Sequence, residues 1–260
     1  HGWVAMHDAI AQSCDVYFYE IARKIGINRL AGTARHFGLG VPTGIDLPAE
    51  SSGLIPDKPW KKTRFKDPWQ IGETLIAGIG QGFVLTTPMQ LAVMTARIVN
   101  GGRAVIPRMV RGEADPPTPS DLGFPPSHLA AVVRGMRGVM TDRSGTAREA
   151  QIPSRALRMG GKTGTSQVRR ITREERRKGV RKNEDLPRKE RDHSLFVGYA
   201  PLNAPRYAVS VVIEHGGSGS KNAAPIGRDV LLEAQTRGSA EWHGGAGQSA
   251  IKAAIKWERG

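Results

Sequence analysis

The sequence predicts an α+β fold, in which a run of helices comes first and a small antiparallel sheet follows. Three observations support this class. A composition with 39% apolar and 24% charged residues over 260 positions is typical of a globular chain. Apolar residues recur at helical spacing in the first half, whereas two short β-rich runs follow in the second half. Helices and strands that are segregated along the chain favour α+β over alternating βαβ units. We expect a helical part over 1–150, a strand part over 151–237 and a disordered tail over 238–260.

The first half predicts four helices from apolar spacing and from capping residues. Ser13 is the expected N-cap of the first helix, and Thr87 followed by Pro88 is a typical start for the third. The segment 40–81 is rich in Pro and Gly and is predicted to be ordered loop. The helices are expected over 15–25, 28–38, 87–101 and 127–140.

The second half predicts three strands and a final helix. Val, Ile, Phe and Tyr dominate 194–199 and 207–213, and a Pro-Leu-Asn-Ala-Pro turn over 201–205 separates these two runs. Together they fit an antiparallel pair. A preceding strand is expected within 155–167, and a helix is expected over 225–235.

The charge is strongly basic, with 38 Lys and Arg against 24 Asp and Glu, a net charge of +14. Such a balance favours anionic partners. Residues 169–191 contain 11 basic and 5 acidic residues and so contribute +6. This stretch contains no aromatic residue, which argues against a binder of single-stranded nucleic acid, and a solvated loop is expected. The single cysteine, Cys14, excludes an intrachain disulfide.

Two short motifs point to chemistry. Ser13, Cys14 and Asp15 stand at the start of a predicted helix, and Gly-Lys-Thr-Gly-Thr occupies 161–165 on a predicted strand. They match two of the three motifs S-x-x-K, S-D-N and K-T-G of serine acyl-transfer enzymes. A lysine and a hydroxyl on a strand edge can hold an anionic ligand, and Gly164 lets the wall of a site approach it. A three-residue motif such as K-T-G often matches by chance. If this match is a chance one, Lys162 is simply a solvated lysine on a strand.

Further short motifs extend this match, and they lie at 43–48, 64–66, 68–69, 78–82, 87–90, 192–193 and 196–201. The sequence resembles the class B penicillin-binding proteins, and among them the elongation-type branch, the penicillin-binding protein 2 group, from residue 1 to about 235. This resemblance implies a penicillin-binding-protein/β-lactamase-like transpeptidase fold, of which the chain holds the helical subdomain and the last three strands of the antiparallel sheet.

The resemblance implies a peptidoglycan D,D-transpeptidase that cross-links stem peptides through a serine acyl-enzyme and is acylated by β-lactam antibiotics. Ser13 is then expected to pass a proton toward the leaving amine. Asp15 stands where most relatives have Asn, and an ionised carboxylate only accepts hydrogen bonds, so a helix-dipole role for Asp15 is the alternative.

The strand motif receives its roles from the same resemblance. Lys162 is expected to act in the proton relay and on the terminal carboxylate of the substrate. Thr163 and Thr165 add hydroxyls for that carboxylate, with Gly164 between them. The backbone N–H of Thr165 would form half of an oxyanion hole.

The nucleophilic serine and its lysine are expected upstream of these residues, so the chain alone is expected to be inactive. One S-x-x-K word occurs, Ser-Gly-Ser-Lys at 218–221, but a flexible turn is expected there. An activated serine needs a rigid helix start and a base held beside it.

No cofactor is required for this chemistry, although zinc is a further hypothesis. Imidazole and thiolate suit zinc, and His1 and Cys14 would be its ligands together with upstream carboxylates.

The partners that the resemblance implies are a glycan polymerase and elongation-complex proteins, and no nucleic acid. The expected location is the periplasmic face of the inner membrane, with an upstream transmembrane helix as anchor.

Three alternatives remain open at this point. A class D β-lactamase and a penicillin-sensing receptor domain use the same motifs, although the loop over 40–69 favours a penicillin-binding protein. A basic nucleic-acid-binding protein is the alternative from another class, and it predicts affinity that falls steeply with salt.

Overall fold

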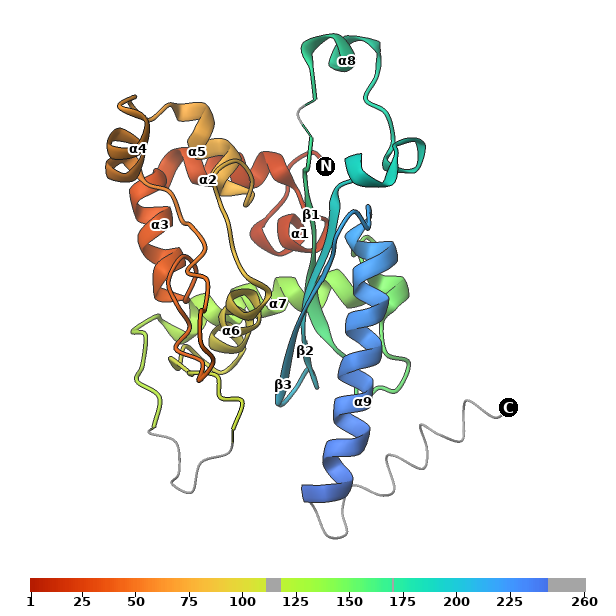
Figure 1. The fold of residues 1–260 in the computed structure, drawn as a ribbon. Coiled ribbons are helices and arrows are strands. Elements are labelled where there is room, and N and C mark those ends of the chain that lie inside the picture. Colours follow the sequence, from red (N-terminus) through yellow and green to blue (C-terminus); the bar gives the residue numbers. More distant parts are fainter. Residues whose placement is uncertain (111–117, 170, 243–260) are drawn as a thin grey trace. The chain divides into compact units, whose positions relative to one another are not determined.

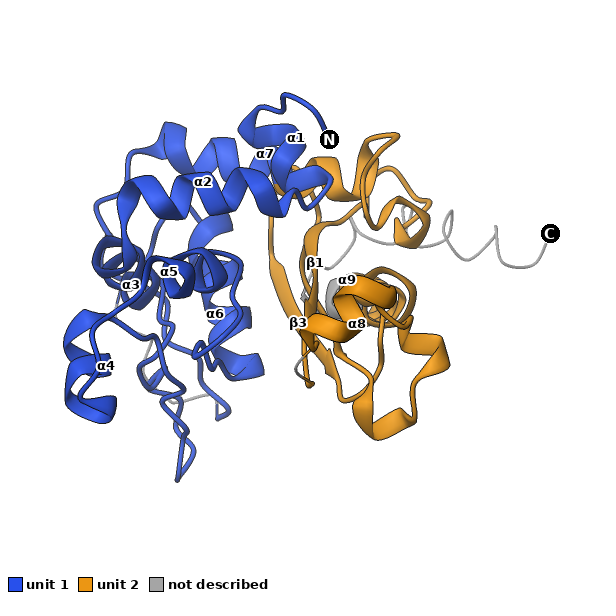
Figure 2. Cartoon of the chain, turned by 90° about the horizontal axis from the view of Figure 1, so that it is seen from above, with its two compact units in different colours: residues 1–135 blue, residues 136–260 orange. Residues whose placement is uncertain are grey.

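Helices and strands are segregated along the chain, so the predicted α+β class is confirmed (Figure 1). The computed structural model describes residues 1–110, 118–169 and 171–242, and of 238–242 the helical backbone only. Two compact units divide the chain, His1–Gly135 and Met136–Gly260 (Figure 2). The division falls after Gly135, within a helix, and so lies before the expected boundary at 150.

The described part of the first unit is helical, with two isolated bridges in its loops. The predicted start of α6 at Thr87 is present as a capping box. Thr87 Oγ1 accepts the N–H of Gln90 at 3.1 Å, and Gln90 Oε1 accepts the N–H of Thr87 at 3.2 Å. The helices are α1 Met6–Ala11, α2 Asp15–Ile25, α3 Ile27–His36, α4 Lys58–Phe65, α5 Ile71–Gly78, α6 Pro88–Val99 and the start of α7 Pro126–Thr141.

Two of these helices, α4 and α5, lie where loop was predicted, so that prediction is wrong. Asp57 caps α4 by accepting the N–H of Trp60 at 2.8 Å, and Pro59 stands in the first helical turn, where its missing N–H costs nothing. Lys61 of α4 is buried, and its ammonium pairs with the Glu73 carboxylate of α5 at 2.6 Å. Proline is common in the first turn of a helix as well as in loops, so its frequency in this segment does not by itself predict loop.

The second unit contains an antiparallel sheet of order β1-β2-β3, and its strands are β1 Gly160–Ser166, β2 His193–Ala200 and β3 Tyr207–Ile213. The helix α9 Ala224–Trp242 packs against β2 and β3 (Figure 1). Phe196 and Tyr199 are fully buried in this core. Glycines at 160, 161 and 227 make room for their rings, because a Cβ at any of them would overlap an aromatic atom.

The helix α9 continues to Trp242, past the start of the predicted tail at 238. The remainder of that tail, 243–260, lies outside the described residues. Between β1 and β2 the chain forms the short helix α8 Arg173–Lys178, which lies beyond the ends of the strands (Figure 1).

No helix in the described ranges combines the length and the apolar character needed to cross a bilayer.

Candidate active site

Ser13 has a left-handed backbone conformation, which residues other than glycine rarely adopt. It follows α1 at the position where a Schellman motif needs a left-handed residue, and its φ is 54°. Both bonds of the motif are present: Ser13 N–H donates to Ile10 O at 3.3 Å, and Cys14 N–H donates to Ala9 O at 2.9 Å. A serine here costs about 1 kcal/mol relative to glycine. Strain of this kind clusters at functional sites, which favours a role for the hydroxyl.

The expected N-cap role of Ser13 is wrong. The N-cap of α2 is Cys14, whose own side chain makes no capping hydrogen bond. Cys14 is buried at 5% exposure, whereas Asp15 begins the helix and is exposed. An acidic residue in a first turn interacts favourably with the helix dipole. Asp15 is thus placed for the dipole role that the sequence left as an alternative.

The strand motif lies on β1, as predicted. Lys162 pairs with Val197, Thr163 with Phe196, and Gly164 and Thr165 follow in register along β2. Among the described strands β1 has a single neighbour, so it is an edge strand of this sheet. An edge strand can take up an extended peptide through its main chain. Lys162, Thr163 and Gly164 are partly exposed and Thr165 is exposed, so a ligand could reach them.

A hydroxyl that the sequence analysis missed supports the strand motif. Thr146 Oγ1 lies 3.0 Å from Thr163 Oγ1, and the two form a hydrogen bond. Lys162 Nζ donates to the carbonyl of Thr163 at 2.9 Å. Both contacts fix the direction of groups in the motif. Thr146 follows the turn after α7, and no pattern in the sequence sets it apart from other loop threonines.

The turn that precedes α9 packs closely against the main chain of Gly164. A π-helical turn, Gly219–Ala223, precedes α9, and a Cβ on Gly219 would overlap the carbonyl oxygen of Gly164 and lie 2.6 Å from that of Leu195. Ser194 Oγ donates to Ser218 O at 2.9 Å and ties this turn to β2. The turn therefore supports the strand that contains the motif.

The S-x-x-K word at 218–221 lies in this turn, which is ordered where a flexible turn was expected. Ser218 Oγ accepts the N–H of Lys221 at 3.3 Å and pairs with Ser220 Oγ at 3.0 Å. The Lys221 side chain is 75% exposed, and its ammonium lies 3.6 Å from the Glu184 carboxylate. A base must be held beside the serine it activates, so this geometry does not suit a nucleophile.

The residues proposed for zinc do not by themselves fit a metal. Across the described ranges, no group of three or more His, Cys, Asp or Glu side chains could hold a metal ion. His1 and Cys14 supply two ligands, and catalytic or structural zinc takes three or four from the protein. Zinc binding stays a prediction that depends on ligands beyond these two.

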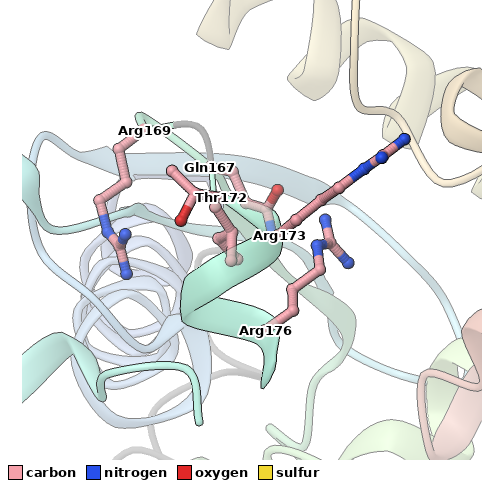
Figure 3. Close-up of a pocket in the computed structure, with 6 residues that line it drawn as sticks. Gln167, Arg169, Thr172, Arg173 and Arg176 are labelled. Carbon is pink, nitrogen blue, oxygen red and sulfur yellow. The ribbon is translucent and has the colours of Figure 1, made fainter. Parts of the chain in front are cut away.

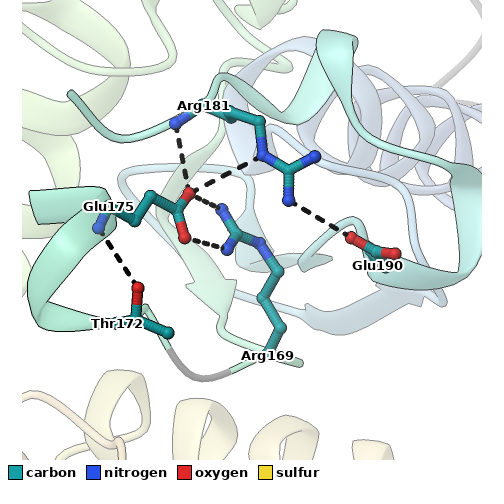
Figure 4. Close-up of polar contacts among 5 residues, drawn as sticks. All are labelled: Arg169, Thr172, Glu175, Arg181 and Glu190. Atoms are coloured by element: carbon teal, nitrogen blue, oxygen red, sulfur yellow. Dashed lines mark hydrogen bonds and ion pairs between the residues drawn. The ribbon is translucent and has the colours of Figure 1, made fainter. Parts of the chain in front are cut away.

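The basic stretch between β1 and β2 is organised by one carboxylate (Figure 4). Glu175 accepts two parallel hydrogen bonds from the guanidinium of Arg169, both of 2.6 Å, and one from Arg181 N–H at 3.3 Å. Thr172 caps α8 by accepting the N–H of Glu175 at 3.1 Å. Arg181 also lies 3.7 Å from Glu190. The loop expected to be merely solvated has an internal framework.

This framework makes the loop sensitive to acid. The hydrogen bonds from Arg169 lower the pKa of Glu175 from 4.5 to about 2. Because the pKa of the folded state is the lower one, the stabilisation is full above pH 4.5 and is lost as the pH falls through about 2. NMR of the Glu175 carboxyl carbon should show a midpoint near 2, and Arg169→Lys should move it toward 4.5. A midpoint near 4.5 in the unmodified protein would contradict the framework.

Comparison with known proteins gives one family. The family described as "Penicillin binding protein transpeptidase domain" matches residues 1–232. The peptidoglycan D,D-transpeptidase MrdA of Haemophilus influenzae is 36% identical over 240 residues, which are 89% of this chain and 36% of that protein. The chain thus spans about a third of the length of this relative.

Solved structures agree with the sequence comparison. The complex between penicillin-binding protein PBP2 and MreC from Helicobacter pylori has a TM-score of 0.78 and 34% identity, over 90% of this chain and 41% of the other. PBP2 of Pseudomonas aeruginosa in complex with WCK 5153 has a TM-score of 0.76 and 38% identity, over 90% of this chain and 49% of the other.

Proposed function

Because this chain belongs to the penicillin binding protein transpeptidase domain family, we propose that the full-length protein is a peptidoglycan D,D-transpeptidase that β-lactams acylate. The single observation that carries the proposal is Lys162, Thr163 and Thr165 on an edge strand, where an extended stem peptide can lie along the main chain. The family match favours this activity over a nucleic-acid-binding protein. The similarity to PBP2 structures favours it over a β-lactamase or a penicillin-sensing receptor domain.

The proposed reaction has two acyl transfers. A serine hydroxyl, from residues outside this chain, attacks the carbonyl carbon between the two terminal D-alanines. The C–N bond breaks, the terminal D-alanine leaves with the proton of the serine, and an ester remains. The amine of a second stem peptide then attacks the ester, forms the cross-link and returns a proton to the serine.

Ser13 and Lys162 handle the proton in this scheme. Ser13 Oγ can accept and donate a proton at once, so it can pass the proton of the nucleophile to the leaving nitrogen. Lys162 keeps positive charge beside that path and attracts the terminal carboxylate of the peptide. Thr163 and Thr165 offer hydroxyls to the same carboxylate, and the N–H of Thr165 polarises the scissile carbonyl.

The partners follow from the same proposal. A cross-linking enzyme needs newly polymerised glycan, so we propose a glycan polymerase and elongation-complex proteins as partners. The Helicobacter pylori relative, which is solved with MreC, supports a partner of that kind. The proposed location is the periplasmic face of the inner membrane, with an anchor in a segment outside this chain.

The placement of the nucleophile can be tested directly. The 260-residue chain, incubated with a fluorescent penicillin and separated by denaturing electrophoresis, should give no labelled band. The full-length protein should give one, because it contributes the serine. A covalent band from the chain alone would refute the placement and would draw attention back to Ser218.

Thr146 is proposed as a positioning residue, because its hydroxyl contacts Thr163 and orients it. Thr146→Val in the full-length protein should lower the acylation rate by penicillin about 10-fold, since one hydrogen bond that aligns a substrate group is lost. Thr146→Ser restores the hydroxyl and should restore the rate, which distinguishes positioning from packing. Equal rates in Thr146→Val and the unmodified protein would remove the role.

A further inference from the structure

A pocket lies in the loop between β1 and β2, which follows the strand motif in the chain (Figure 3). Its volume is about 570 Å³, which is large enough for a small ligand or a headgroup. Among the described residues, the lining is basic and contains no acidic side chain. The residues that line it are Gln167, Arg169, Ile171, Thr172, Arg173 and Arg176.

One of the three arginines serves the framework of the loop. Arg169 makes the paired hydrogen bonds to Glu175, and both side chains are largely buried, at 17% and 15% exposure. In Figure 3 its guanidinium points away from those of Arg173 and Arg176. Arg169 therefore holds the wall of the pocket, and its charge is offset by Glu175.

The other two arginines have no such partner. Arg173 and Arg176 make no ion pair within the described ranges, and they stand one turn apart on α8. Figure 3 shows both side chains extending from the same side of the helix. Glu174, which follows Arg173 in the chain, is paired with Lys178 at 2.6 Å. In the part of the chain that the structure describes, two positive charges of the lining are thus left without an ion-pair partner.

We propose that this pocket binds a phosphate group. Two guanidiniums present parallel N–H donors that match phosphate oxygens, and a phosphate monoester carries close to two negative charges at neutral pH. A carboxylate would offset one of the two charges only. The same phosphate chemistry occurs in a soluble phosphate compound and in an anionic lipid headgroup, and the experiment separates these sources.

The position of the pocket gives it a connection to the site strand. Gln167 lines the pocket and follows Ser166, the last residue of β1, directly in the chain. A ligand that orders this loop would therefore order the end of the strand that contains Lys162 and Thr165. The phosphate site stands without the proposed enzyme activity, since its test measures binding only.

The test follows the arginine side chains themselves. The 260-residue chain, labelled with ¹⁵N, is titrated at low ionic strength with inorganic phosphate while the arginine Nε–H signals are recorded by NMR. The signals of Arg173 and Arg176 should shift together and saturate at millimolar phosphate. The double variant Arg173→Gln/Arg176→Gln should bind about 10-fold more weakly, because two charge-assisted contacts are lost.

A matched control removes equal charge from the same loop outside the pocket. The double variant Arg188→Gln/Lys189→Gln should bind phosphate within about 2-fold of the unmodified chain, because exposed charges at a distance are screened. Equal weakening in both double variants would overturn the proposal in favour of diffuse charge attraction. The absence of any saturable shift would overturn it as well.

The source of the phosphate follows from vesicles. Vesicles of phosphatidylcholine with and without phosphatidylglycerol are mixed with the chain and sedimented. Binding that needs phosphatidylglycerol and Arg173 with Arg176 identifies a lipid headgroup, whereas phosphate binding without vesicle binding identifies a soluble compound. The phosphate site would be contradicted if Arg173→Gln/Arg176→Gln bound the vesicles as well as the unmodified chain and inorganic phosphate caused no saturable NMR shift. If an oligonucleotide bound more tightly than phosphate and its binding also depended on both arginines, the pocket would be a nucleic-acid site instead of a phosphate site.

Discussion

Lys162→Ala in the full-length protein is expected to lower the rate of acylation by penicillin about 10³-fold. The variant loses the ammonium that the proposed relay needs and that attracts the carboxylate of the ligand. Lys162 Nζ also donates to the carbonyl of Thr163, so the motif loses an internal bond. The second-order acylation rate constant, measured with a fluorescent penicillin by stopped flow, checks the expectation.

Lys221→Ala is the matched control. Lys221 is the lysine of the S-x-x-K word and is largely exposed, and its removal should leave the acylation rate unchanged. Normal acylation of Lys162→Ala would remove the strand motif from the site. A large loss in Lys221→Ala would assign the chemistry to the turn before α9.

Gly219→Ala is expected to lower the free energy of unfolding by about 3 kcal/mol, as overpacking in a well-packed core does. The added methyl would overlap Gly164 O, approach Leu195 O to 2.6 Å and Gly164 N to 3.1 Å. All three atoms belong to the main chain of the sheet, so no side chain can move aside. The strand motif must shift instead, and acylation should fall with stability. Chemical denaturation of the full-length protein measures the change.

Gly32→Ala provides the comparison. Gly32 lies within α3, where an added Cβ meets no atom within 4 Å. Alanine is the better helix former by about 1 kcal/mol, so this variant should be as stable as the parent or more so. An unchanged stability in Gly219→Ala would mean that the turn and the strand are not packed as described.

The elements with the clearest periodicity were predictable from sequence. The helix α2 spans 15–25 and β3 spans 207–213, both as expected, because the first has apolar residues at helical spacing and the second consists of β-favouring residues. The start of α6 was predictable because a threonine and a proline in that order satisfy a helix start locally. Local signals were sufficient wherever local contacts decide the structure.

The remaining features depend on contacts between distant residues. The helices α4 and α5 are joined through the buried Lys61 and its partner Glu73. Because their segment is rich in proline, the sequence predicted loop there. The left-handed conformation of Ser13 follows from a helix end that normally has glycine, so its residue type pointed to a cap instead. Thr146 supports Thr163 across 17 positions, and only the fold brings them together.

The proposed reaction requires that Ser13 and Lys162 act on the same peptide. A crystal structure of the full-length protein acylated by a β-lactam tests it through the distance between Ser13 Oγ and Lys162 Nζ. We predict hydrogen-bonding distance, about 3 Å, with the acylated serine beside both. An acyl-enzyme in which the two atoms face different surfaces of the molecule would contradict the account.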